Sequence, residues 1–154
     1  MVNLQQLKAE LQADPAGRGY MAHVPHAPGA LADLLNAPST TLAKTRMVTA
    51  RGIMASYGMG PDAGAAFLDK LESLASSVPA IKWAMKFLLA EAGIDVGEPA
   101  TQLMLTSLIG VGGITADEVS GVKAMALQPA SRAEVLFGVG VQITEADVRA
   151  ALEV

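Results

Sequence analysis

Residues 80–92 read AIKWAMKFLLAEA, and this stretch decides the fold. Its apolar residues fall at the i, i+3, i+4, i+7 and i+8 positions that mark one face of an amphipathic helix: Ile81, Ala84, Met85, Leu88 and Leu89. Trp83 and Phe87 widen that face and leave a thin polar stripe with Lys82 and Lys86. A helix with so much apolar circumference is expected to be buried on most sides. It is either the central helix of the fold or lies between the core and a neighbouring subunit, with Trp83, Met85, Leu88 and Leu89 largely buried.

The composition around this segment favours a helical protein. Hydrophobic residues make up 51% of the chain, but aromatic residues only 4%. The apolar side chains are therefore mainly Ala, Leu, Val, Met and Ile, which suit close helix packing better than a β-sandwich. With 154 residues, the chain fits one compact domain. The sequence predicts a mostly α fold, a single compact multi-helix domain over residues 1–154 that includes one short two-stranded β element.

Capping residues and breakers divide the chain into seven to nine short helices. Asn3 can cap a first helix that carries Leu4, Leu7 and Leu11 and ends at Asp14-Pro15. Three later helices begin at capping boxes, in which a Ser or Thr precedes an acidic residue by three positions: Thr115…Glu118, Ser131…Glu134 and Thr144…Asp147. The remaining helices are expected at about 30–36, 49–57, 62–76, 80–92 and 100–109.

Two segments have an extended character. Residues 40–48 contain three threonines and a valine, and residues 138–143 alternate as GVGVQI. Because neither has another obvious partner for its backbone groups, we expect part of Thr40–Val48 to pair with Val139–Ile143.

Charge and cysteine content exclude several classes of function. The net charge is −4, and the eleven basic residues are scattered from Lys8 to Arg149, so direct nucleic-acid binding is disfavoured. The chain has no cysteine, which excludes disulfides and thiolate sites. The longest apolar run, Leu103–Ile114, is too short to cross a membrane, and residues 1–14 lack the apolar region of a signal peptide. We therefore expect a protein made and assembled in the cytoplasm, without contact to a membrane.

No constellation of residues predicts catalysis. His23 and His26 lie three apart but flank Pro25 and have no carboxylate nearby until Asp33, so ordinary loop histidines are favoured over a metal site. The glycines at 110–113 and 138–140 match no phosphate-binding motif and are interpreted as helix ends with positive φ. Several carboxylates of the middle of the chain lie near helix starts, on solvated helix faces or in turns, where acidic residues need no chemical role: Asp62, Asp69, Glu72, Glu91, Asp95 and Glu98. The sequence predicts no catalytic, cofactor-binding or metal residues, and no enzyme.

Three stretches together suggest a relationship. They are LKAELQADPAGRGY (7–20), VPAIKWAMKFLLAEAGIDVGEPATQLML (78–105) and LQPASRAEVLFGVGVQITEADVRAAL (127–152). Over nearly its full length the chain resembles a group of small proteins encoded by tailed bacteriophages and prophages. The resemblance implies a phage origin and a role in the virion, at the tail, neck or capsid, and it brings no catalytic residues.

Composition also predicts association. Charged residues are only 17% of the chain, against roughly 25% in an ordinary soluble domain, so apolar surface is expected beyond what one small core can cover. The first hypothesis is therefore a virion structural or assembly protein, a homo-oligomer that contacts other phage structural proteins. The alternative is a small phage-encoded regulator or inhibitor that binds a host protein. A lysis enzyme and a DNA-binding factor are disfavoured by the absence of a site and by the acidic charge.

Overall fold

The computed structural model describes residues 2–153 and is 60% helical. Its described residues form nine α-helices, two short 3₁₀ helices and two two-stranded sheets, so the mostly helical class is confirmed. The chain divides into two compact units, unit 1 with residues 1–42 and 129–154 and unit 2 with residues 43–128. Each unit has its own cluster of buried hydrophobic residues, where the sequence predicted one core.

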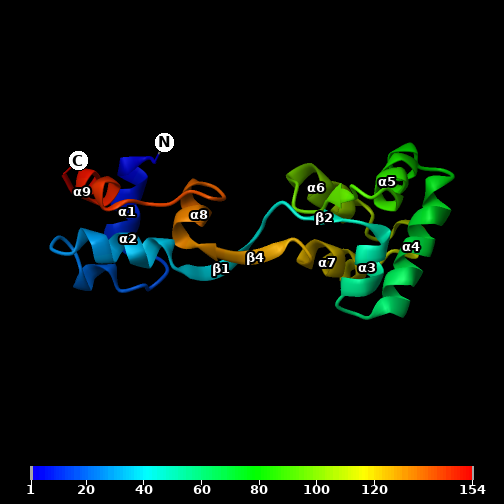
Figure 1. Cartoon of the computed structure of the whole chain (residues 1–154), viewed down its shortest axis with the longest axis horizontal. Helices are drawn as coiled ribbons and strands as arrows, with labels where there is room; N and C mark the ends of the chain where they lie inside the picture. The colour runs from blue at the N-terminus through cyan, green and yellow to red at the C-terminus, as the bar shows by residue number, and fades with distance from the viewer. Residues whose placement is uncertain (1, 154) are drawn as a thin grey trace. The chain divides into compact units, whose positions relative to one another are not determined.

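Unit 1 joins the two ends of the chain. Its helices are α1 (Leu4–Ala13), η1 (Tyr20–Ala22), α2 (Pro28–Asn36), α8 (Arg132–Phe137) and α9 (Glu145–Glu153). Helix α9 packs against both α1 and α2, and Figure 1 shows the first and last helices side by side. Leu7 and Leu11 of the predicted stripe are fully buried, and the side chain of Asn3 caps α1 by accepting a hydrogen bond from the Gln6 amide. The first helix is therefore confirmed, and its apolar face is covered by the last one.

A buried ion pair ties α1 to α8. Arg132 donates from Nε to Glu10 Oε1 at 2.7 Å and from Nη2 to Glu10 Oε2 at 2.8 Å. The Glu10 side chain is only 4% exposed. Because a buried carboxylate is costly without a partner, the position of Arg132 is fixed by Glu10.

We predict that Arg132→Ala lowers the free energy of unfolding by about 3–5 kcal/mol, because it leaves the Glu10 charge buried and unpaired. Urea denaturation followed by circular dichroism measures this loss. The control is Arg149→Ala, which removes the exposed ion pair with Glu145 within α9 and should cost less than about 1 kcal/mol. Equal losses for the two variants would contradict the structural importance of the Glu10–Arg132 pair.

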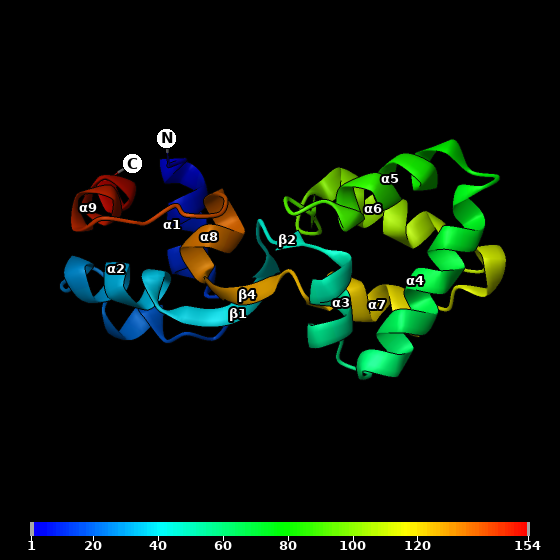
Figure 2. The same ribbon diagram turned by 45° about the vertical axis from the view of Figure 1, so that its right-hand side comes forward.

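Unit 2 is a helical bundle formed by the middle of the chain. It contains α3 (Ala50–Ser56), α4 (Pro61–Ala75), α5 (Pro79–Leu89), α6 (Pro99–Ser107), η2 (Val111–Gly113) and α7 (Ala116–Ala124). Helix α4 packs against α3 and α5, as Figure 2 shows, and α6 packs against α7. Near the centre the rings of Tyr57 and Phe67 stack with centroids 6.3 Å apart, and the Tyr57 hydroxyl donates to the Glu118 carbonyl. A Cβ atom at position 121 would lie 2.8 Å from the Tyr57 ring, so residue 121 must be glycine for the ring to lie where it does.

Helix α5 is buried on one side only. Ile81, Met85 and Leu88 face the core and are at most 9% exposed, which confirms the prediction for Met85 and Leu88. Trp83 is 57% and Leu89 is 72% exposed, so the prediction that these two are buried is wrong. The elements that pack on α5 are α4, α3 and β3 (Ile94–Asp95), and they cover one face of the helix. Periodicity located the helix correctly, but it could not say how many faces its neighbours cover.

Neighbouring leucines at the end of α5 give a matched test of this arrangement. Leu88→Ala should lower the free energy of unfolding by about 2–5 kcal/mol, since it removes a buried side chain from the core of unit 2. Leu89→Ala, one residue on, should change it by no more than about 0.5 kcal/mol in the dilute protein. Urea titrations at low protein concentration measure both values, and a larger loss for Leu89→Ala would reverse the orientation assigned to the helix.

The extended segments pair differently from the prediction. Strand β1 (Pro38–Ala43) pairs with β4 (Leu127–Ser131), and β2 (Met47–Val48) pairs antiparallel with β3. The extended character of residues 40–48 is thus confirmed in part, but their predicted pairing with Val139–Ile143 is wrong. Residues 138–143 form turns and irregular chain.

The Asn36 side chain forms the two backbone hydrogen bonds that a neighbouring strand would have formed with Ile143. Asn36 donates from Nδ2 to the Ile143 carbonyl at 2.7 Å and accepts from the Ile143 amide at 2.9 Å. Both backbone groups of Ile143 are satisfied in this way, so the segment needs no sheet.

All three predicted capping boxes are present. Thr115 with Glu118 begins α7, and Ser131 with Glu134 begins α8, each with both reciprocal hydrogen bonds. At the start of α9 the Thr144 amide donates to Asp147 Oδ2, and the Asp147 amide donates to Thr144 Oγ1. These local signals were reliable because each box satisfies amides that the helix itself leaves unpaired.

Candidate interaction surface

The outward side of α5 exposes large aromatic side chains. Trp83 and Phe87 lie one helical turn apart and are each 57% exposed, opposite the buried Ile81, Met85 and Leu88. We call Trp83 and Phe87 the outer face of α5. Leu89, at the end of the same helix, is also exposed, but it lies two residues from Phe87 and so on a different side of the helix. Large apolar side chains grouped on a surface typically mark an interaction site, whereas single exposed ones need no explanation.

The charge of α5 is entirely positive. Its sequence, PAIKWAMKFLL, contains Lys82 and Lys86 and no carboxylate. The Lys86 ammonium lies 4.1 Å from the centroid of the Trp83 ring, a cation–π contact that holds the indole along the helix. The outer face is therefore an ordered aromatic surface next to two cations.

Local sequence explains where α5 begins and ends. Pro79 occupies the first turn, where its missing N–H costs nothing, and Lys86 lies in the last turn, where a cation is favoured. Ala90 leaves the helix in an extended conformation. The helix therefore presents just three turns, with one face for the core and one for solvent.

Helix α6 repeats this division less strongly. Leu105 and Leu108 are buried, whereas Leu103 is 73% exposed. Between the inner faces of α5 and α6 lies an apolar cavity of about 30 Å³, lined among others by Ala84, Met104 and Leu108. This volume is far smaller than the several hundred cubic ångströms of typical small-molecule sites. The cavity is a packing defect of the core and does not resemble a ligand site.

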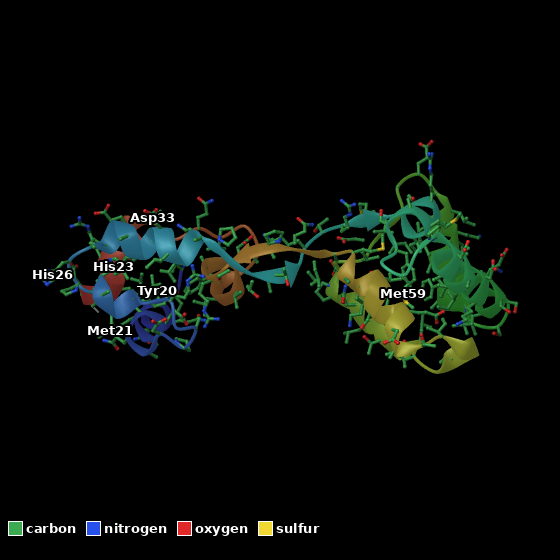
Figure 3. All side chains as sticks on the ribbon, turned by 90° about the horizontal axis from the view of Figure 1, so that it is seen from below. Tyr20, Met21, His23, His26, Asp33 and Met59 are labelled. Carbon is green, nitrogen blue, oxygen red and sulfur yellow. The ribbon has the colours of Figure 1, made fainter. Side chains whose placement is uncertain are left out.

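The two histidines lie in the loop before α2, in unit 1. Figure 3 shows His23 and His26 there, with Asp33 on the following helix. Across residues 2–153, no group of three or more His, Cys, Asp or Glu side chains is placed to hold a metal ion.

The glycine clusters end helices, as interpreted from the sequence. Gly110 follows α6 with φ 84°, and Gly138 ends α8 with φ 109°. Both values lie in the region that strongly favours glycine, so these residues are explained by the turns.

The carboxylates singled out in the sequence do not come together in a cleft. Five of them are exposed: Asp62, Asp69, Glu72, Glu91 and Glu98. Asp95 accepts hydrogen bonds from the amides of Arg46 and Gly97 through Oδ1, and the Arg46 bond contributes most to lowering the pKa of Asp95. Its role is to join the β2 and β3 segments.

Glu118 is a further carboxylate whose surroundings are structural. Burial acts to raise the pKa of Glu118, but hydrogen bonds from Lys70 and from Thr115 hold it below the ordinary value. The Lys70 ammonium lies 2.7 Å from Oε1. This pair links α4 to the start of α7.

Sequence reasoning missed one polar pocket in unit 1. Two arginines line it, Arg18 from the loop after α1 and Arg132 from α8. Both arginines lie in the stretches DPAGRGY and SRAEVLFG, but these stretches are far apart along the chain, so the sequence did not show that their arginines line one pocket.

Comparison of the chain with protein-family models, with curated proteins and with solved structures finds no match. Over residues 2–153 no helix is both long and apolar enough to span a bilayer.

Proposed function

We propose that the protein is a structural or assembly component of a tailed-phage virion, associated with the tail, neck or capsid. It acts through protein–protein contacts, as a homo-oligomer or as a subunit of a larger lattice. The resemblance of residues 7–20, 78–105 and 127–152 to small phage proteins supports the phage origin. The observation that carries the assembly role is the outer face of α5, where Trp83 and Phe87 are exposed together.

The energetics favour this surface as a contact. Tryptophan is prominent among the residues that dominate binding energy at interfaces, and aromatic side chains bury a large area at a low cost in conformational entropy. The outer face lies on a regular helix whose inner face is anchored in the core by Ile81, Met85 and Leu88. A partner would meet a preformed surface, so little binding energy would be lost in ordering it.

Self-association can be tested with the double variant Trp83→Ala/Phe87→Ala. We expect the wild-type chain to form oligomers. The double variant should associate with a dissociation constant at least about tenfold higher, because these two rings form the contact. Analytical ultracentrifugation with interference optics measures this without depending on the tryptophan absorbance that the variant removes. The control is Met59→Ala. The exposed fraction of Met59, 57%, equals that of Trp83 and Phe87, but Met59 lies in the loop that connects α3 to α4 (Figure 3).

Mass spectrometry of purified virions tests where the oligomer acts. We expect to find the protein in purified particles at a copy number that is reproducible between preparations. Its absence from virions, with capture of a host protein through the outer face, would support the alternative of a phage-encoded regulator. A wild-type chain that stays monomeric at high concentration and is absent from virions would contradict the structural role.

A further inference from the structure

Unit 1 contains a pocket of about 280 Å³ lined by two arginines and two hydroxyl residues. Its lining residues are Ala16, Arg18, Ser39, Thr40, Arg132 and Val135. They come from three separate parts of the chain, the loop after α1, strand β1 and helix α8. The pocket therefore joins the DPAGRGY and SRAEVLFG stretches, for which the proposed assembly role gives no explanation.

One arginine of the pocket is held rigidly. Arg132 gives Nε and Nη2 to Glu10, which leaves Nη1 for another acceptor. Its backbone lies in the first turn of α8, which the Ser131–Glu134 capping box fixes. Glu10 balances the charge of Arg132, and both of its carboxylate oxygens are occupied by this pair.

The other arginine has a fixed backbone and an unengaged side chain. Asp14 accepts hydrogen bonds from the amides of Arg18 and Gly19, both at 2.7 Å, and so closes the loop that carries Arg18. Within residues 2–153 the Arg18 guanidinium makes no hydrogen bond and no ion pair. The Asp14 oxygens accept two backbone amides and do not bond to the guanidinium. The half-buried Arg18 side chain is therefore left in the pocket with unsatisfied donors.

A buried hydroxyl lies in the same charged surroundings. Tyr20 is fully buried, and its hydroxyl has no hydrogen-bond partner among the described residues. Burial raises the pKa of Tyr20 to about 12, and the charges of Glu10, Arg18 and Arg132 all act on it. The hydroxyl is therefore a protonated donor, and a buried donor without an acceptor is unusual. Tyr20 does not itself line the pocket.

We propose that this pocket binds a small oxyanion, a phosphate group or a carboxylate. The planar fork of Arg18 supplies the paired, charge-assisted hydrogen bonds that such groups accept. Arg132 Nη1 and the hydroxyls of Ser39 and Thr40 are further donors lining the pocket. Glu10 accepts from Arg132 and Asp14 accepts backbone amides, so neither side chain forms an ion pair with the Arg18 guanidinium. Their two negative charges balance those of the two arginines, so the pocket must select an anion by the geometry of its donors and not by a net positive charge.

Thermal unfolding of the full chain in sodium phosphate, sodium acetate and sodium chloride at equal ionic strength tests the proposal. We expect phosphate, acetate or both to raise the melting temperature above that in chloride, with saturation as the anion is titrated. Because phosphate also stabilises folded proteins without binding to a site, only saturable stabilisation that Arg18→Ala weakens counts as binding. Such stabilisation by phosphate alone would indicate a phosphate group as the ligand, and by acetate alone a carboxylate. No stabilisation beyond that of chloride by either anion would overturn the proposal.

The variant Arg18→Ala locates the effect. It should weaken the apparent affinity by about tenfold or more, because it removes the charge-assisted donors. Since the Arg18 guanidinium has no partner in the described chain, this variant should fold normally, which circular dichroism checks. The control is Arg51→Ala, an exposed arginine of unit 2, which should keep the full response. An equal loss in both variants would show a general effect of charge and would overturn the site.

Amide chemical shifts give a second readout that does not depend on stability. On titration with phosphate, the amides of Arg18, Gly19, Ser39 and Thr40 should shift together with one dissociation constant. Shifts confined to other regions would overturn the pocket as the binding site.

Discussion

Helix α5 carries apolar side chains on two opposite sides, and unit 2 covers only one of them. Ile81, Met85 and Leu88 anchor the helix against α3 and α4, so the orientation of the helix cannot change without emptying the core. That orientation leaves Trp83 and Phe87 in solvent. The proposal of an assembly protein follows from this constraint, because the exposed rings cannot be withdrawn into the unit that carries them.

Unit 1 combines an apolar core with polar contacts between distant parts of the chain. Glu10 and Arg132 join α1 to α8, and Asn36 holds the backbone of Ile143. These contacts connect residues more than 100 positions apart along the chain. The Glu10–Arg132 pair fixes the helix that carries Arg132, and the backbone amides that donate to Asp14 fix the loop that carries Arg18. The two arginines can therefore line one pocket although they come from opposite ends of the sequence.

Local signals in the sequence predicted the helices well. The capping boxes at Thr115, Ser131 and Thr144, and the helix end at the 110–113 glycines, depend on residues within a few positions of each other, so they can be identified without knowledge of the fold. Long-range features failed. Strand β1 pairs with a segment that contains Pro129 and does not resemble a strand in sequence. The partner that we expected for β1 ends at Ile143, whose backbone groups bond instead to the Asn36 side chain.

The sequence predicted burial correctly for the residues of α5 that face the core, but not for the residues on its other sides. Met85 and Leu88 were expected to be buried and are; Trp83 and Leu89 were expected to be buried and are exposed, because apolar character on a helix does not show how many neighbours surround it. The sequence left open whether this helix is central to the fold or lies beside a neighbouring subunit. The exposure of its outer face favours the second interpretation.

Trp83 is the only tryptophan of the chain, so its fluorescence tests the central claim most directly. With selective excitation of tryptophan, quenching by acrylamide can be measured over a range of protein concentrations while light scattering reports the mass. If the outer face of α5 is the contact, Trp83 is readily quenched in the dilute monomer and becomes protected in step with the rise in mass. Oligomers that form while Trp83 stays equally accessible, or a chain that never associates, would contradict this account.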